Sequence, residues 1–186
     1  MTIVITQPDF FDGEAEQIVQ LLHRGDVDLI HIRKPNATIE AVEALIKQIP
    51  STLYDKLVLH DFHALAPKYN LYGIHLNSRN PQPLSGWTGS ISISCHTLDE
   101  LKECQKTNFN YMSLSPIFDS ISKVGYKSAF TEEELRKAHH EGIINERVMA
   151  LGGVTFERIP NVLDLGFGGG MILGDAWQSH KTIDNS

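Results

Sequence analysis

Short apolar runs recur along the chain, each followed by a polar turn and then by apolar residues at helical spacing. Several of these runs are continuous rather than alternating, which is typical of strands buried on both faces of a parallel sheet. The pattern predicts eight strands. They are Ile3–Thr6, Leu29–Arg33, Leu57–His60, Gly73–Leu76, Ile91–Ser94, Tyr111–Leu114, Val148–Leu151 and Gly170–Leu173.

Helical patterns lie between the predicted strands. Thr131 and Glu134 form a capping-box pattern, in which the side chain and backbone of each residue satisfy the other at a helix start. The predicted helices are Glu14–Arg24, Thr38–Ile49, Thr97–Lys106 and Thr131–His140. Ala64–Tyr69 and Pro81–Trp87 leave room for only a turn or two of helix.

Alternation of strands and helices predicts an α/β fold, and eight such units favour a closed (β/α)8 TIM barrel. The chain has 186 residues, so the barrel is short and we expect one domain over residues 1–186. A doubly wound sheet is the alternative. It usually has a glycine-rich turn after its first strand, and Gln7–Phe11 contains no glycine.

The net charge, the apolar stretches and the cysteines indicate which binding partners and which cellular compartment to expect. Net charge is −7, from 16 basic and 23 acidic residues, which argues against nonspecific nucleic-acid binding. No apolar stretch approaches the ~20 residues of a membrane span, and the first residues lack the pattern of a signal peptide. With only Cys95 and Cys104, both expected to be reduced thiols, we expect a cytoplasmic protein without membrane contact. A homo-oligomeric state stays open.

The candidate chemistry gathers where the strands end, since barrel enzymes carry their active residues at the carboxyl ends of the strands. Cationic and hydroxyl side chains there suit phosphate oxygens. They are Arg33, Ser120, Ser122 and Lys123. Asp61 is placed to hold a divalent metal beside a pyrophosphate.

Glycines follow the last two strands, at the frequent phosphate site of this fold. Gly152, Gly153 and Gly174 can expose backbone N–H groups and let an anion approach closely. The residues therefore predict a protein that binds small phosphorylated molecules. Each feature also has a simpler interpretation, because the glycines can form an ordinary turn and Asp61 can cap the next helix.

Several segments resemble, in order and spacing, those of the thiamine phosphate synthase and thiazole tautomerase family, from about Ile3 to Trp177. The most specific is the loop Pro116–Lys123, which is similar to the family's P-[IV]-[FY]-x-T-x-[TS]-K. The others are Ile30–Arg33 (family Q-L-R), Leu59–Asp61 (I-N-D), Gly73–Leu76 (G-[VI]-H-[LV]), Ile93–Thr97 ([VI]-S-x-H-[ST]) and Met149–Val154 ([VI]-A-[IL]-G-G-[IV]).

The resemblance implies that a pyrimidine pyrophosphate is joined to a thiazole phosphate with release of pyrophosphate. It assigns Arg33, Ser94 and Lys123 to catalysis. It assigns Mg2+ to Asp61, with Asn80 at the place of a second carboxylate. The residues expected to contact substrate are His31, His60, Ser120, Ser122, Gly152, Gly153 and Gly174.

The chain departs from the family segments at several positions. The second basic residue after strand two falls on Pro35, which adjacent Lys34 would replace. His60 takes the place of the Asn in I-N-D, and Asn80 should weaken the metal site because an amide carries no charge. The position of the tautomerase's active histidine is occupied by Pro116, so this chain has no histidine there.

Three functions follow from this pattern. The first is the transferase, thiamine phosphate synthase, indicated by the hydroxyl–lysine loop and Asp61. The second is an isomerase acting on thiazole phosphate, indicated by His31 and His60. The third is a non-catalytic binder of thiazole phosphate or thiamine phosphate, indicated by the number of departures.

Overall fold

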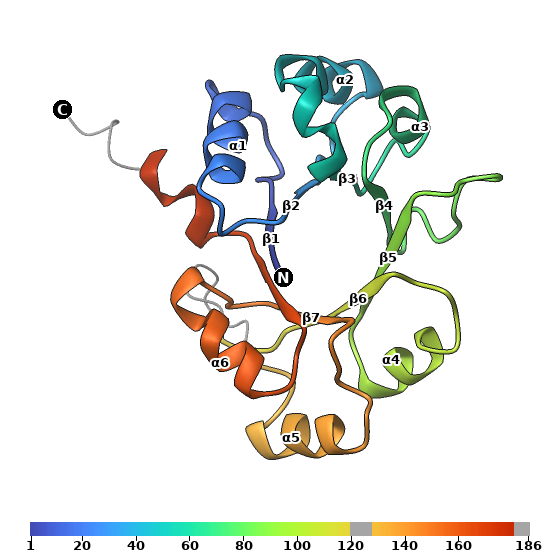
Figure 1. Ribbon diagram of the computed structural model, residues 1–186, viewed down its shortest axis with the longest axis vertical. Helices are drawn as coiled ribbons and strands as arrows, with labels where there is room; N and C mark the ends of the chain where they lie inside the picture. The colour runs from blue at the N-terminus through green and yellow to red at the C-terminus, as the bar shows by residue number, and fades with distance from the viewer. Residues whose placement is uncertain (120–127, 181–186) are drawn as a thin grey trace.

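The computed structural model, which describes residues 1–119 and 128–180, is a closed barrel of parallel strands paired in chain order (Figure 1). The first strand also pairs with the last, Ile3 beside Met171, so no sheet edge is left open. The strands are β1 (Thr2–Ile5), β2 (Leu29–Ile32), β3 (Leu57–Leu59), β4 (Gly73–Leu76), β5 (Ser90–Cys95), β6 (Tyr111–Leu114), β7 (Val148–Leu151) and β8 (Gly169–Ile172). The predicted barrel and its eight strands are confirmed, each strand end to within one residue.

Helices surround the barrel, and α2, α4 and α5 each begin at a threonine whose side chain caps the first turn. Thr38 and Thr97 each accept a hydrogen bond from a backbone N–H of the first turn, and Thr131 forms the predicted capping box with Glu134. The α-helices are α1 (Glu14–His23), α2 (Ile39–Gln48), α3 (Leu65–Tyr69), α4 (Leu98–Cys104), α5 (Glu132–His140) and α6 (Ile159–Asp164). The 3-10 helices are η1 (Ser51–Lys56), η2 (Phe156–Arg158) and η3 (Asp175–His180). None of the helices in the described ranges is long and apolar enough to cross a membrane.

The connection from β4 to β5 differs from the others, because it extends outward without a helix (Figure 1). The helical stub predicted at Pro81–Trp87 is therefore wrong. The indole of Trp87 folds back over Gly89, where a Cβ atom would come within 2.2 Å of the ring. Trp87 packs against the core together with Ile91 and Ile93 of β5, so one side chain covers a face that elsewhere is covered by a helix.

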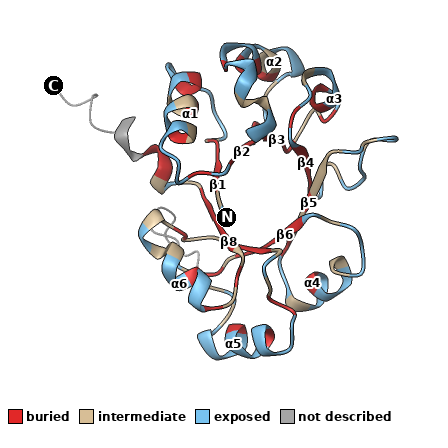
Figure 2. Cartoon of the chain, viewed as in Figure 1, coloured by how far each residue is buried: buried red, intermediate tan, exposed pale blue. Residues whose placement is uncertain are grey.

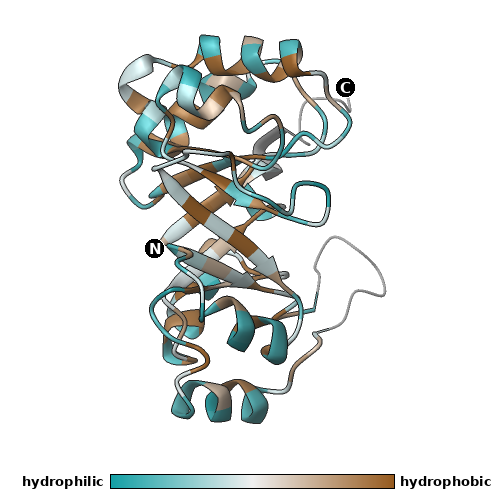
Figure 3. Ribbon diagram, turned by 90° about the vertical axis from the view of Figure 1, so that its right-hand side faces the viewer, coloured by the Kyte–Doolittle hydropathy of each residue, from teal (hydrophilic) through white to brown (hydrophobic). Residues whose placement is uncertain are grey.

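Two regions of the molecule exclude water. The larger lies between the strands and the helices, whose outer faces are exposed and polar (Figures 2 and 3). The smaller lies inside the barrel and contains buried apolar residues from β1, β2, β3, β7 and β8. They are Ile3, Ile5, Leu29, Val58, Met149 and Met171, with the ring of Tyr111 beside them. Polar side chains from β2 to β6 fill the rest of the interior.

The two cysteines lie next to each other where β5 is followed by α4. Cys95 is buried, Cys104 is half-buried, and both are free thiols, as predicted. Burial, together with the neighbouring Cys104 thiol, raises the pKa of the Cys95 thiol above its usual range. A thiol held protonated is a poor nucleophile, so Cys95 serves as a core residue.

Candidate active site

The side chains predicted to hold a metal lie together at the carboxyl ends of β3 and β4. Asn80 Nδ2 donates to Asp61 Oδ1 at 3.0 Å and to the His60 carbonyl at 3.1 Å. Asn77 also donates its side-chain amide to the His60 carbonyl, at 2.9 Å. These bonds hold the turn after β4 against the residue that precedes Asp61.

Arg79 adds a cation to this pair and was given no role from the sequence. Its Nε and Nη2 atoms donate to the two Asp61 carboxylate oxygens at 3.1 and 3.2 Å. Such a two-point contact fixes the geometry of both groups more firmly than a single hydrogen bond does. The Arg79 side chain remains 43% exposed, so the guanidinium can also contact a ligand at the mouth of the barrel.

Arg33 follows β2 at the same end of the barrel. Its backbone N–H donates to Thr6 Oγ1 at 2.9 Å, and the Thr6 hydroxyl donates to the Arg33 carbonyl at 3.3 Å. In the part of the chain that the structure describes, no residue forms a hydrogen bond or ion pair with its half-buried guanidinium. The positive charges of Arg33 and Arg79 both reach His60, where they add to the effect of burial in lowering its pKa.

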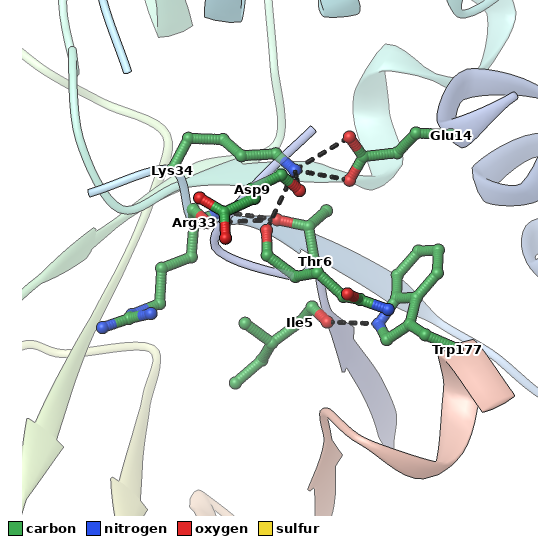
Figure 4. A network of polar contacts seen from close by, with 8 residues as sticks. Ile5, Thr6, Asp9, Glu14, Arg33, Lys34 and Trp177 are labelled. Atoms are coloured by element: carbon green, nitrogen blue, oxygen red, sulfur yellow. Dashed lines mark hydrogen bonds and ion pairs between the residues drawn. The ribbon is translucent and has the colours of Figure 1, made fainter. Parts of the chain in front are cut away.

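Lys34 does not replace the missing basic residue, and that expectation is wrong. Its side chain extends in a different direction from that of Arg33, and its Nζ donates to both Glu14 oxygens, at 2.7 and 2.8 Å (Figure 4). It also donates to the carbonyls of Gln7 and Asp9, at 2.9 and 2.8 Å. Burial lowers the pKa of the Lys34 ammonium and raises that of the Glu14 carboxyl, although each partner opposes the shift of the other. The pair links β2 to α1 and leaves Arg33 as the cation of this segment.

Beneath the mouth, three histidines share the barrel interior. His31 Nδ1 lies 2.9 Å from His60 Nε2, and the ring of His60 stacks on that of His75 with centroids 4.2 Å apart. His31 Nε2 lies 2.6 Å from the Tyr111 hydroxyl. The two nitrogens of His75 each lie 2.8 Å from a serine hydroxyl, Nδ1 from Ser92 and Nε2 from Ser94.

Burial dominates the electrostatics of these rings. It lowers the pKa of His31 and His60 well below the usual range, with a further contribution from the charge of His75. Burial, together with His63, lowers the pKa of His75 to about 3. All three imidazoles are therefore neutral near neutral pH. The structure places His31, with no exposed surface, and His60, 5% exposed, beneath the mouth, while half-buried Ser94 connects His75 to it.

The glycines after β7 have backbone conformations that other residues rarely adopt. Gly152 and Gly153 have φ angles of 94° and 64°, and a Cβ at Gly153 would come within 2.5 Å of the Asp119 carbonyl oxygen. Their carbonyls accept hydrogen bonds from Phe118 N and Arg158 Nη1. No described residue accepts a hydrogen bond from the backbone N–H of Gly152, Gly153 or Gly174.

Ser120, Ser122 and Lys123 lie outside the described residues. The residues that flank them are held near the glycines. Asp119 Oδ1 accepts a hydrogen bond from the Ser128 backbone N–H at 2.7 Å, and Phe118 N–H donates to the Gly152 carbonyl. The loop after β6 therefore begins and ends beside the backbone donors that follow β7.

Comparison with known proteins decides the family. The sequence pattern of the family described as thiamine monophosphate synthase matches residues 2–173. The chain belongs to this family. The resemblance seen in the sequence is therefore confirmed.

Curated thiamine phosphate synthases are similar over most of their length. The thiamine-phosphate synthase of Halalkalibacterium halodurans is 30% identical over 172 residues, which cover 87% of this chain and 80% of that protein. The enzyme of the same name from Clostridium acetobutylicum is 23% identical over 98% of this chain and 87% of its own length.

Solved structures agree in fold. Thiamine phosphate pyrophosphorylase from Bacteroides thetaiotaomicron superimposes with a TM-score of 0.87 at 36% identity, covering 100% of this chain and 88% of the other. Thiamine phosphate pyrophosphorylase from Pyrococcus furiosus has a TM-score of 0.74 at 21% identity, covering 94% and 89%, and shows the shared fold. His31, His60 and His75 all lie within the residues that the family pattern matches, and together they form the histidine cluster.

Proposed function

We propose that this protein is a thiamine-phosphate synthase, which joins hydroxymethylpyrimidine pyrophosphate to thiazole phosphate and releases pyrophosphate. The observation that carries the proposal is a pair of anion-binding regions at one end of the barrel. Arg33 and Arg79 supply cations after β2 and β4, and the glycines after β7 and β8 supply backbone N–H groups from which no described residue accepts a hydrogen bond. A reaction between two phosphorylated substrates requires two such regions.

The pyrimidine pyrophosphate is assigned to the cationic region. Arg33 is the strongest candidate there, because its guanidinium has no ion-pair partner among the described residues and a planar guanidinium suits phosphate oxygens. Ser94 would donate its hydroxyl while His75 holds it in place. Ser120, Ser122 and Lys123 are assigned to the same substrate from the sequence alone.

Mg2+ is assigned to Asp61, with Asn80 beside it. The donor set fits this ion, because Mg2+ in nucleotide and pyrophosphate sites commonly takes one or two protein oxygens and completes its shell with substrate oxygens and water. To expose both oxygens, Asp61 must release Arg79, and Asn80 must turn its amide oxygen toward the ion. A bound Mg2+ supplies a Lewis acid for the phosphoryl oxygens.

The thiazole phosphate is assigned to Gly152, Gly153 and Gly174. A phosphate seated on backbone N–H groups needs no cationic side chain, and glycine permits the close approach. In this assignment the pyrimidine pyrophosphate lies at the carboxyl ends of β2 to β4, and the thiazole phosphate lies at those of β7 and β8.

The family resemblance implies dissociative chemistry. The C–O bond to pyrophosphate breaks first, the leaving group takes the bonding electron pair, and the thiazole nitrogen then donates its lone pair to the resulting pyrimidinyl cation. The protein stabilises the negative charge that develops on the leaving pyrophosphate, which is the usual role of preorganised cations and hydroxyls. Arg33, Ser94 and Lys123 are the groups we assign to it.

We further infer a cytoplasmic enzyme acting on small phosphorylated molecules without nucleic acid. The net charge of −7 and two free thiols support this assignment.

A coupled assay for pyrophosphate release tests the function. With both substrates and Mg2+, we expect turnover that chelation abolishes. Arg33→Ala and Lys123→Ala should each lower kcat/KM by about 100- to 1,000-fold, by analogy with lost oxyanion donors. Lys137→Ala, on the exposed face of α5, is the matched control and should retain activity. Thiazole isomerisation without pyrophosphate release would support the isomerase, and thiazole phosphate binding without turnover would support the non-catalytic binder.

A further inference from the structure

The histidine cluster carries a property that the proposed reaction does not use. Barrels of this kind are usually filled by branched aliphatic side chains. Here His31, His60 and His75 project inward from three consecutive strands or their ends and are all buried. One ring nitrogen of each lies within 4.8 Å of those of the other two. Three neutral imidazoles that converge on one point form a donor set for a transition-metal ion.

The spacing suits such an ion. Zn2+ binds imidazole nitrogens at about 2.0–2.1 Å, so two ligating nitrogens in a tetrahedral site lie roughly 3.3 Å apart. His31 Nδ1 and His60 Nε2 are 2.9 Å apart, and a small outward movement of either ring would admit the ion between them. Near neutral pH all three rings are neutral, which is the form that binds metal.

The remaining nitrogens are held as in known metal sites, where a ligating histidine uses its second nitrogen to bond a protein group. His31 Nε2 faces the Tyr111 hydroxyl at 2.6 Å, which leaves Nδ1 directed at the other rings. His75 has a serine at each nitrogen, so it can release one of the two and keep the other. These contacts orient the rings before any ion binds.

We propose that His31, His60 and His75 form a buried site for one divalent transition-metal ion, for which Zn2+ is the best match. The site is distinct from the Mg2+ position assigned to Asp61. Three imidazoles favour Zn2+, Co2+ or Ni2+ over Mg2+, which takes oxygen ligands. A bound ion would cross-link β2, β3 and β4 inside the barrel and stabilise the folded chain by mass action.

Co2+ is the probe, because tetrahedral coordination gives visible absorption bands that report the ligand geometry directly. The protein is prepared without a histidine tag and freed of metal by chelation, and Co2+ is then titrated in the presence of excess Mg2+. We expect one equivalent of Co2+ to bind with tetrahedral bands, to be displaced by Zn2+, and to raise the thermal midpoint. His75→Gln should abolish the bands.

A second variant addresses the risk that His75→Gln does not fold. Tyr111→Phe keeps all three imidazoles and removes only the hydroxyl beside His31, and it should weaken Co2+ binding by about 10- to 100-fold. His140→Gln, on α5, is the control and should leave Co2+ affinity unchanged. Absence of stoichiometric binding, displacement by Mg2+, or unchanged affinity in either folded test variant would overturn the proposal. None of these readouts depends on catalytic activity, so they are independent of the proposed synthase function.

Discussion

Two buried polar clusters lie on opposite sides of β2, and each avoids an unpaired buried charge in a different way. Outside the barrel, the Lys34 and Glu14 side chains are 0% and 2% exposed and meet as an ion pair. Inside the barrel, the histidine cluster contains three titratable side chains, and no acidic side chain of residues 1–119 or 128–180 forms a hydrogen bond or ion pair with them. The first cluster keeps its charges by pairing them, and the second remains neutral.

The comparison shows what each cluster requires of its neighbours. A buried ammonium is strongly destabilising unless a carboxylate and further acceptors satisfy it, and Lys34 has Glu14 and two carbonyls. A neutral imidazole needs only one acceptor and one donor, which hydroxyls of Tyr111, Ser92 and Ser94 can provide. Loss of a partner should therefore lower the free energy of unfolding most at the charged cluster. Acid should lower it most at the neutral cluster.

Removing one charge of the ion pair should have the largest effect. Lys34→Met leaves Glu14 buried without a partner, and we expect a loss of about 3–5 kcal/mol in the free energy of unfolding, measured by urea denaturation. The double variant Lys34→Met with Glu14→Leu should be more stable than the single variant, because no charge remains buried. A double variant as unstable as the single one would show that the carbonyl contacts of Lys34, not its charge, dominate.

Acid should destabilise the histidine cluster by the next largest amount. The folded pKa of His75 is lowered to about 3 against an unfolded value of 6.5, so the unfolded chain binds more protons between these values. Stability is therefore retained above about pH 7 and lost as pH falls from 6.5 toward 3. Protonation of His75 in the unfolded chain should by itself lower the free energy of unfolding by about 2 kcal/mol at pH 5. Urea unfolding of metal-free protein at pH 7.5 and 5 measures this, and His75→Gln should show a weaker pH dependence.

Loss of one neutral partner should be milder than loss of a charged one. Ser92→Ala removes the hydroxyl 2.8 Å from His75 Nδ1 and leaves a buried nitrogen unpaired. The expected cost is about 1–3 kcal/mol, measured by the same denaturation at pH 7.5. A cost as large as that of Lys34→Met would contradict the distinction between charged and neutral burial.

An exposed ion pair should have the smallest effect. Arg24 and Asp26 meet at 2.7 Å with side chains 47% and 50% exposed. Asp26→Asn should change the free energy of unfolding by no more than about 1 kcal/mol, since solvent screens such pairs. A larger loss would show that pairing itself, rather than burial, makes the Lys34–Glu14 contact strong.

Much of the fold could be predicted because its signals are local. The apolar runs located all eight strands, and the Thr131–Glu134 pattern predicted its capping box. The missing helix after β4 could not be predicted, because Pro81–Trp87 has a length that permits a turn of helix and only the packing of Trp87 removes the need for it.

The candidate site was harder to predict from the sequence than the fold, because its contacts join segments that are distant along the chain. The meeting of Asp61 and Asn80 followed from the rule that strand ends converge, whereas the engagement of Asp61 by Arg79 depends on side-chain geometry within the loop. Lys34 was misplaced because adjacent residues at a strand end point in opposite directions. His75 lay in a recognised segment, but its contact with His60 depends on the closure of the barrel.

The β4–β5 connection also gives the molecule two separate fluorescent reporters. Trp87 covers the side of the barrel where the β4–β5 connection has no helix, while Trp177 is 2% exposed and donates its indole N–H to the Ile5 carbonyl at 2.8 Å. An opening that begins at the β4–β5 side would expose Trp87 to water first and shift its emission to longer wavelength. Single-tryptophan variants would thus separate a local fluctuation of this side from cooperative unfolding of the whole barrel.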